Sequence, residues 1–589
     1  MLAVCYFYCQ QFIKKKKKVI TSNYSYKDAF LIFIFSILLP INLFASNDDI
    51  ISSRPNILLI VADDLGWSDL GSFGGEIMTP NLDELALAGI RLTNFHTAPT
   101  CSPTRSMLLS GTDSHLAGLG NMEEELGPNQ IGKRGYEGYL NKDVVTFASL
   151  LQNSGYRTMM TGKWHLGASI EKGPESRGFD DAFVIANGIS NHFRQERIVG
   201  FERDVITKAP YREQGKPIDL IEPFYSSELY TDKLINYIKE HQQNNNTDDK
   251  PFFAYAAYSA PHWPLQAPDE FINKYQGRYD SGYENIRSLR LKKLNELGLI
   301  NINKAPTSDL WPTWNELDKE SQNKEAKRME VYAGMVEALD HHIGRLIAYL
   351  KEAGIFDNTV IVFLSDNGAE GNDPRVILEN ASWIPANFDN SIENMGRANS
   401  HISYGPRWAE VSSTPYKDFK GFPSEGGLLS PAFITYSGFN QQTINHAFTS
   451  IMDIAPTFLE IAKTKHPGTQ YQGKAIHPIK GKSMIAMLKG KNKTVHSEDN
   501  IMGWELFNRK AIRKGTWKII WIEKPHGNDR WALYNLKNDP LEQDDLAEKN
   551  TQKLKEMISL WETYKKENGV IIDEDLNLGY SGSNSHFNY

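Results

Sequence analysis

Four short stretches combine acidic, amide, basic or imidazole side chains, and each follows a candidate strand. They are Asp63-Asp64 after NILLIVA, Lys163 and His165 in GKWHLG, His262 in APHWP, and Asp366-Asn367 in SDNG. Continuous apolar, β-rich runs such as NILLIVA are typical of strands buried on both faces. In open α/β sheets, ligand sites lie beyond the carboxyl ends of such strands. The sequence therefore predicts that these side chains meet at one edge of a sheet.

Three carboxylates and one amide in these stretches form a set with oxygen ligands only: Asp63, Asp64, Asp366 and Asn367. Hard divalent cations such as calcium and magnesium prefer oxygen ligands, and this combination suits calcium. Asp and Asn are also common in turns, so each pair taken alone is accounted for by a capping role. Two such pairs at the ends of two buried strands favour a metal site.

The basic and imidazole residues could bind an anion. Lys163 and His165 are two residues apart, so in an extended segment their side chains would share a face. His262 lies between two prolines that stiffen its backbone, and an isolated histidine of this kind is usually structural. Lys420, in YKDFKGFPSEGG, is expected from its local sequence alone to be a solvated surface lysine.

The stretch TAPTCSPTRSMLLSG holds the one cysteine that is far from the N-terminus. Pro103 fits the first position of a helix, with Ser102 as its cap and Gly111 as its end. Cys101 would then lie at the helix entrance, where free amides and the helix dipole favour an anion. Arg105 adds a charge that can donate two hydrogen bonds to an oxyanion. A buried structural cysteine is the alternative, and these anion-favouring surroundings argue against it.

Strands and helices alternate along most of the chain, which indicates an α/β protein with a mostly parallel sheet. The segments that carry this rhythm are 54–71, 81–97, 143–167, 250–264 and 326–371. The last part differs: RKAIRKGTWKIIWI and DRWALYNLKNDPLEQDDLA resemble a hairpin, and an amphipathic helix follows it. We therefore expect a larger α/β domain over residues 54–464 and a smaller α+β domain over residues 465–589.

The N-terminus carries a cationic run, Lys14–Lys18, and then an apolar run, Ala29–Ser46, that ends in small residues. This order predicts a signal peptide over residues 1–46 and a periplasmic or secreted protein without stable membrane association. A membrane anchor is the alternative, because the apolar run approaches the length of a spanning helix. Cleavage would remove Cys5 and Cys9, leaving one cysteine and no possible internal disulfide.

The composition limits the remaining classes of function. The chain has 589 residues, 40% of them apolar and 23% charged, which is ordinary for a globular protein. The net charge of −8 gives no basic surface for nucleic acid, and no nucleic-acid partner is expected. Any bound anion would have to be held by a local cluster of cations.

The residues around Cys101 resemble the type I, formylglycine-dependent sulfatases. CSPTRSMLLSG has their Cys-x-Pro-x-Arg core, and GKWHLG is similar to their second signature. The resemblance extends to ADDLGWSDLG, APHWPLQAP, SDNGAEG, ANSHISYGPRWAEVSSTPYKDFK and MGWELFNRKAIRKGTWKIIW, and it looks closest to the bacterial arylsulfatases. It implies an alkaline-phosphatase-like fold, with a mostly parallel sheet flanked by helices and a smaller C-terminal domain.

The resemblance also implies roles for ten residues. Cys101 would be oxidised to formylglycine by a maturation enzyme, and one calcium ion would be held by Asp63, Asp64, Asp366, Asn367 and the modified Cys101. Arg105 would steady the formylglycine hydroxyls, and Lys163 and Lys420 would bind sulfate oxygens. His262 would bind sulfate or protonate the leaving group, and His165 would act on the second hydroxyl.

The implied reaction is hydrolysis of aryl or alkyl sulfate monoesters. One hydroxyl of the hydrated aldehyde attacks sulfur, the alcohol leaves with a proton from His262 or Lys420, and the second hydroxyl, assisted by His165, expels sulfate. Two alternatives stay open: a phosphonate monoester or phosphodiester hydrolase of the same superfamily, and an unmodified protein that binds sulfated ligands.

Two segments, 187–228 and 371–400, are expected to shape the substrate pocket. Their aromatic side chains indicate only that something apolar fits, and each could equally serve packing. These are Phe193, Phe201, Tyr211, Phe224, Tyr225, Trp383 and Phe388.

Overall fold

The structure is a computed structural model that describes residues 54–197, 207–244, 250–373 and 383–572. The predicted leader, with Cys5 and Cys9, lies outside the described residues, as does Phe201. No helix in the described ranges is long and apolar enough to cross a membrane.

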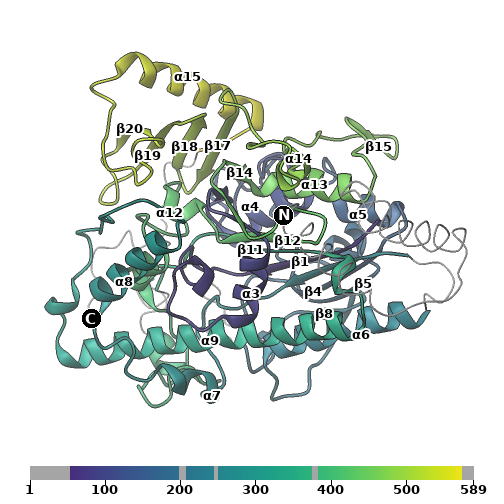
Figure 1. Ribbon diagram of the computed structural model, residues 1–589, viewed down its shortest axis with the longest axis horizontal. Coiled ribbons are helices and arrows are strands. Elements are labelled where there is room, and N and C mark those ends of the chain that lie inside the picture. Colours follow the sequence, from purple (N-terminus) through teal and green to yellow (C-terminus); the bar gives the residue numbers. More distant parts are fainter. Residues whose placement is uncertain (1–53, 198–206, 245–249, 374–382, 573–589) are drawn as a thin grey trace, which may run out of the picture. The chain divides into compact units, whose positions relative to one another are not determined.

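A ten-stranded mixed sheet forms the centre of the body (Figure 1). Its strands, in spatial order, are β13 (Thr443–Asn445), β2 (Ile90–Leu92), β12 (Ala432–Thr435), β11 (Thr359–Ser365), β1 (Asn56–Ala62), β10 (Phe252–Ala257), β4 (Arg157–Lys163), β5 (Asp181–Ile185), β8 (Tyr211–Glu213) and β9 (Lys216–Pro217). The five strands from β11 to β5 are parallel, and β12 and β8 pair with them antiparallel. The predicted α/β fold with a mostly parallel sheet is confirmed.

Helices cover both faces of this sheet. One face carries α3 (Pro80–Ala88), α6 (Ser226–Asn244), α7 (Asp269–Ile272) and α9 (Lys319–Glu352). The other carries α4 (Cys101–Ser110), α5 (Phe147–Asn153) and α13 (Ile454–Ile461). Because both faces are covered, NILLIVA and TVIVFLS are buried along their whole length, as continuous apolar strands require.

Further helices and strand pairs belong to the described part of this body. The helices are α8 (Tyr283–Glu296), α10 (Trp383–Asn387), α11 (Gly405–Ser412), α12 (Glu425–Leu428) and α14 (Ile485–Leu488). The strand pairs are β3 (Phe95–His96) with β14 (Thr449–Ser450), β6 (Glu196–Arg197) with β7 (Thr207–Lys208), and β15 (Gln470–Tyr471) with β16 (Lys474–Ala475).

A separate antiparallel sheet lies near the C-terminus. It contains β17 (Ile501–Leu506), β18 (Arg509–Lys514), β19 (Trp517–Ile522) and β20 (Arg530–Asn535), and α15 (Thr551–Asn568) packs on one face. The hairpin predicted from RKAIRKGTWKIIWI lies within this sheet, and IMGWEL adds β17 beside it. The domain boundary near residue 465 stays a prediction.

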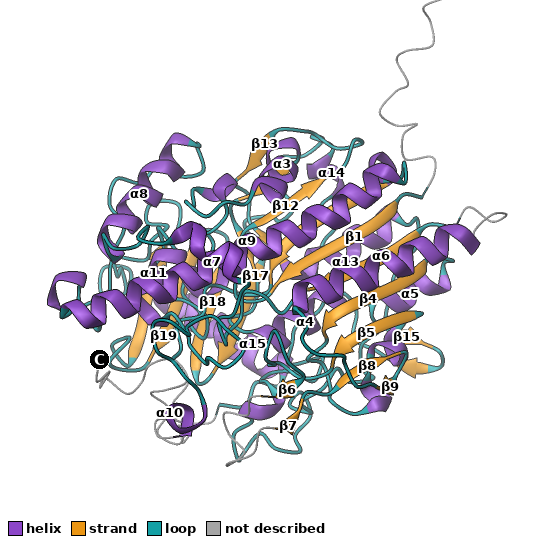
Figure 2. Cartoon of the chain, turned by 90° about the horizontal axis from the view of Figure 1, so that it is seen from below, coloured by secondary structure: helices purple, strands orange, loops and turns teal. Residues whose placement is uncertain are grey.

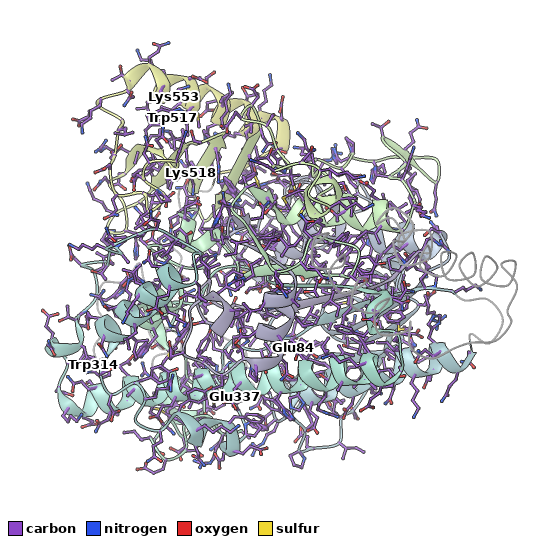
Figure 3. All side chains as sticks on the ribbon, viewed as in Figure 1. Glu84, Trp314, Glu337, Trp517, Lys518 and Lys553 are labelled. Atoms are coloured by element: carbon purple, nitrogen blue, oxygen red, sulfur yellow. The ribbon has the colours of Figure 1, made fainter. Side chains whose placement is uncertain are left out.

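Neighbouring residues of β19 face opposite sides of this sheet. Trp517 lies on the side of α15, where the ammonium of Lys553 is 5.8 Å from its ring (Figure 3). Lys518 points the other way and is fully buried, with Nζ 2.6 Å from Glu425 at the start of α12 and 2.9 Å from Glu542. The small sheet is thus tied to the main body by buried charges.

A second buried cluster joins the loop after α4 to the same sheet. The ring of His115 bonds to Asp113 through Nδ1 (2.9 Å) and lies 3.5 Å from Glu505 of β17 through Nε2. Tyr564 of α15 donates a hydrogen bond to the other oxygen of Asp113. Burial alone would lower the pKa of His115, but the hydrogen bonds and charges of Asp113 and Glu505 outweigh it and raise the pKa to about 9.

His115 predicts a pH-dependent stability. Folding raises the pKa of His115 from 6.5 to about 9. Its contribution to the free energy of unfolding is therefore fully present below pH 6.5 and is lost as the pH rises through 9. We expect the free energy of unfolding to fall by about 3 kcal/mol over this range, and the decline to be much smaller in His115→Gln. Denaturant unfolding of both proteins between pH 6 and 10 measures it, and an equally steep decline in the variant would contradict the assignment.

Candidate active site

The predicted site residues meet at the carboxyl edge of four neighbouring parallel strands. Ala62 of β1 lies opposite Ser365 of β11, and on its other side β1 pairs with β10, which in turn pairs with β4. Figure 2 shows β1, β4 and β5 running in the same direction across the sheet. The residues that follow β1, β11 and β10, and the last residue of β4, therefore emerge at one edge, as the sequence predicted.

Asp64 is the most connected carboxylate at this edge. Its Oδ1 accepts a hydrogen bond from Asn367 (2.6 Å), and its Oδ2 lies 2.9 Å from Lys420 Nζ and 3.3 Å from His262 Nε2. Its backbone amide donates to Asp366 (3.2 Å). Asp64 has a φ of 68°, so the chain turns sharply as soon as the strand ends.

Cys101 lies against both aspartates of the first pair. Its Sγ is 3.5 Å from Asp63 Oδ1 and 3.7 Å from Asp64 Oδ1, and the residue is 1% exposed. Burial raises the pKa of the thiol well above its usual value, although the charges of Lys163 and Lys420 act in the opposite direction.

The predicted start of the helix that carries Cys101 was wrong by two residues. The helix begins at Cys101 itself, after Thr100, and Ser102 is its second residue rather than its cap. Proline is tolerated throughout the first turn, where its missing N–H would have no partner, so Pro103 does not fix the first position. The predicted end is right, since Gly111 closes the helix with a φ of 67°.

Arg105 points from α4 into the same edge and is fully buried. Its Nε and one terminal nitrogen both donate to Asp366 Oδ2 (2.9 and 2.7 Å), and the other terminal nitrogen donates to the carbonyl of Lys163. Although burial opposes its charge, Asp366 more than compensates and raises the pKa of Arg105. The two guanidinium hydrogen bonds that the sequence analysis assigned to an oxyanion are therefore made to a carboxylate in this structure.

Two buried lysines flank the carboxylates. Lys163 Nζ lies 2.7 Å from Asp63, and Lys420 Nζ lies 2.8 Å from Glu370 as well as against Asp64. The expectation of a solvated Lys420 was wrong, since it is 1% exposed. Glu370, four residues after Asp366, was missed because nothing in SDNGAEG separates it from a surface glutamate.

The segment that carries Lys163 and His165 is not extended to its end, so the reason given for a shared face does not hold. β4 ends at Lys163, and His165 has a φ of 53°, so the segment is not extended there. His165 Nε2 bonds to Glu124 (2.9 Å), and this carboxylate was also missed because it lies in an undistinguished acidic run. Burial would raise the pKa of Glu124, but the charge and hydrogen bond of His165 lower it to about 2.

The side chain of His262 has a fixed proton position. Its Nδ1 lies 2.6 Å from the carbonyl of Trp263, which can only accept, so Nδ1 carries a hydrogen. Nε2, which faces Asp64, is therefore the atom at which a second proton is gained or lost. Burial lowers the pKa of His262 well below its usual value.

The structure separates the candidate pocket aromatics into two groups. Phe193 packs with Tyr225, and Tyr211 with Phe224, so these four serve packing. Trp383 and Phe388 belong to a row of ring contacts that starts at the carboxyl edge of the sheet: His262–Trp263 (4.9 Å between centroids), Trp263–His401 (5.6 Å), His401–Phe388 (5.1 Å) and Phe388–Trp383 (5.6 Å). The indole N–H of Trp263 is buried without a hydrogen-bond partner among the described residues.

The donor set fits a hard cation. Asn367 Oδ1 is a buried acceptor without a hydrogen-bond partner in the part of the chain that the structure describes, and a cation would satisfy it. Ligand atoms of Asp63, Asp64, Cys101 and His262 lie within 4.8 Å of one another. Asp366 is linked to this group through Asp64 and Arg105. Two of the predicted ligands, Asp63 and Asp64, thus belong to a possible metal-binding group, and Asp366 and Asn367 are hydrogen-bonded to Asp64 beside it.

Comparisons with known proteins agree on one family. A family model described as Sulfatase matches residues 55–464, and one described as N-sulphoglucosamine sulphohydrolase, C-terminal, matches residues 419–567. An uncharacterized sulfatase of Schizosaccharomyces pombe is 45% identical over 90% of this chain and 97% of its own length. The arylsulfatase of Klebsiella aerogenes is 38% identical over 76% of this chain and 94% of its own. The crystal structure of Ps i-CgsB has a TM-score of 0.61 at 25% identity, covering 88% of this chain and 94% of that one.

Proposed function

Because the chain belongs to the sulfatase family and is a hydrolase of sulfuric esters, we propose that it cleaves aryl sulfates through a formylglycine made from Cys101, with one calcium ion at the same site. The predicted family and the alkaline-phosphatase-like architecture are confirmed. The proposal concerns the nucleophile, the metal, the roles of individual residues and the kind of ester.

One observation carries the proposal: the Cys101 side chain lies among buried carboxylates that are paired with buried lysines. Its sulfur is within 3.7 Å of Asp63 and Asp64, and each of these carboxylates pairs with a buried lysine. A sulfate monoester is an anion, so an attack on its sulfur brings a second negative charge close to it. Buried, preorganised cations stabilise the charge that develops on the sulfate oxygens.

Asp63, Asp64, Asp366 and Asn367 are the residues that would hold calcium, together with the modified residue 101. A bound calcium ion supplies Lewis-acid stabilisation of negative charge at the reacting oxygens. The orphaned amide oxygen of Asn367 supports this assignment. His262 is assigned to the substrate instead, because calcium prefers oxygen ligands.

Formylglycine supplies a hydrated aldehyde, whose two hydroxyls provide both a nucleophile and an internal route for sulfate release. Arg105 is rigidly held by Asp366 and steadies this side chain. The ammonium groups of Lys163 and Lys420 lie within the buried site, where they donate hydrogen bonds to sulfate oxygens. Both lysines are needed, because the incoming anion must find charges that water cannot screen.

Two histidines move protons in this proposal. His262 Nε2 is assigned to the leaving oxygen, because Nδ1 is already committed to the carbonyl of Trp263. The charge of the bound sulfate ester offsets the burial that lowers the pKa of this ring, so that Nε2 can carry the proton that it delivers. His165 acts on the second hydroxyl, and its bond to Glu124 orients the ring.

The ring contacts beginning at His262 support an aromatic leaving group. If His262 protonates the leaving oxygen, the rest of that group lies near the ring of Trp263, which is next in the row. A neighbouring aromatic ring favours an aryl over an alkyl group, since ring pairs are worth about 1 kcal/mol beyond area burial. The name of the Klebsiella relative agrees with this choice.

Maturation requires a partner. Cys101 is 1% exposed, so a formylglycine-generating enzyme would reach the Cys-x-Pro-x-Arg segment before the chain folds. The cationic and apolar N-terminal runs support export to the periplasm or the medium.

Matched substrates test the kind of ester. We expect kcat/KM to be highest for an aryl sulfate, lower for an alkyl sulfate and lowest for an aryl phosphodiester. Trp263→Leu is expected to reduce the aryl-to-alkyl ratio roughly 5- to 10-fold, whereas Phe193→Leu, in a packing cluster, leaves the ratio unchanged. Faster turnover of the phosphodiester would contradict the reaction class, and an unaltered ratio in Trp263→Leu would contradict the aryl assignment.

A further inference from the structure

The hairpin formed by β17 and β18 contacts the segment that leads into α4 and the loop that carries Lys420. Trp504 of β17 donates its indole N–H to the carbonyl of Thr97 (2.9 Å). Leu506 and Phe507, at the hairpin tip, pack against Met122. The small C-terminal sheet is thus in contact with the segments that build the site, although none of its residues was assigned a role in the reaction.

Arg509, the first residue of β18, is locked in place by three neighbours. Nε and one terminal nitrogen donate to Glu523 (2.9 and 2.5 Å), and the guanidinium carbon lies 3.9 Å from the ring centre of Phe422. The residue is 2% exposed. With the plane fixed in this way, the remaining terminal nitrogen donates to the carbonyl of Gly421 at 3.0 Å.

Gly421 connects the two halves of the site. Its amide donates to the carbonyl of Pro99 (2.7 Å), two residues before Cys101, and its neighbour Lys420 bonds through its own amide to Ala369. Gly421 has a φ of 90°, a conformation that side chains other than glycine rarely adopt. A displacement of this peptide would therefore move Lys420 and the entrance of α4 relative to each other.

We propose that Arg509 is a positioning residue for sulfate hydrolysis, which places the Lys420 ammonium and Cys101 by fixing the Gly421 peptide. The inference rests on the proposed role of Lys420. Glu523 stabilises the guanidinium of Arg509, whereas Arg509 itself makes the hydrogen bond to Gly421.

The test is a double-substitution cycle of Arg509→Lys with Lys420→Ala, assayed on an aryl sulfate. A lysine keeps the positive charge opposite Glu523, but its single ammonium group cannot donate to Glu523 and to the Gly421 carbonyl in the fixed planar geometry of a guanidinium. We expect Arg509→Lys to lower kcat/KM by about 10- to 100-fold, since small displacements from reactive geometry have effects of this size. In the Lys420→Ala background the same change should have less than a 3-fold effect, because the group it positions is gone.

Two controls separate positioning from stability. Glu523→Gln removes the charge but keeps an acceptor oxygen for Arg509, and the ring of Phe422 still supports the guanidinium plane, so the bond to Gly421 is kept. This variant should lower Tm and leave kcat/KM within about 3-fold. Arg530→Lys alters a half-exposed ion pair with Asp545 on the same sheet and should change neither. All rates are taken per mole of aldehyde at position 101, which removes differences in maturation.

The outcomes distinguish the inference from its premise. Equal effects of Arg509→Lys with and without Lys420, or a loss of Tm with full activity, would overturn the role of Arg509. An active Lys420→Ala enzyme would instead overturn the assignment of Lys420 in the proposed function.

Discussion

Cys101→Ala is expected to lower kcat by roughly 10⁴-fold or more, because alanine cannot be converted to the aldehyde whose hydrate supplies the attacking hydroxyl. The fold should survive, since the sulfur contributes only contacts of 3.5 and 3.7 Å to two carboxylates at the end of the sheet. The measurement is steady-state turnover of an aryl sulfate, paired with thermal unfolding and circular dichroism.

Ser102→Ala provides a matched control for this prediction. Ser102 is buried beside Cys101, and its hydroxyl has no hydrogen-bond partner among the described residues, so its removal should leave both turnover and Tm close to wild type. Substantial activity in Cys101→Ala would refute the nucleophile. A protein that only binds sulfated ligands would show no turnover. Turnover of an aryl sulfate by the wild-type protein would therefore exclude that alternative.

Asp64→Asn is expected to lower kcat/KM by about 10³-fold and to abolish tight calcium binding. The change preserves the shape of the side chain but removes the charge on which Asn367, Lys420 and His262 converge. Calorimetric titration of chelator-treated protein with calcium measures the affinity. Unfolding with and without calcium measures the stabilisation, which rises with metal concentration only where the folded site binds.

Asp340→Asn is the control for this second prediction. Asp340 is an equally buried carboxylate, but it accepts hydrogen bonds from Asn81 and Leu82 at the start of α3, away from the site. It should lower Tm and leave calcium affinity unchanged. An Asp64→Asn enzyme that retains both calcium binding and turnover would show that Asp64 is not a calcium ligand.

Much of the architecture could be predicted because it follows from local periodicity. NILLIVA and TVIVFLS are long enough and apolar enough to specify buried strands, and the polar residues that follow them fall at the sheet edge for the same reason. The Cys-x-Pro-x-Arg core is a short contiguous motif, so it needs no knowledge of the fold. The fold class and the convergence of the strand ends were therefore accessible from the sequence.

The remaining features depend on pairings between distant segments. Lys420 is buried only because it meets Asp64, 356 residues earlier, and a single sequence does not give the strand order that brings them together. Glu124, Glu370 and Arg509 are ordinary charged residues until their partners are known. The left-handed backbone at His165 is equally invisible, since non-glycine residues rarely adopt it.

The central claim is that residue 101 is an aldehyde, not a cysteine, in the working enzyme. Mass spectrometry of the tryptic peptide Leu92–Arg105, from active protein made in its native host, tests this directly. The account predicts a peptide lighter than the cysteine form by the difference between –CH2SH and –CHO, and reactive toward a hydrazide. A fully active preparation that yields only the free-thiol peptide would contradict it.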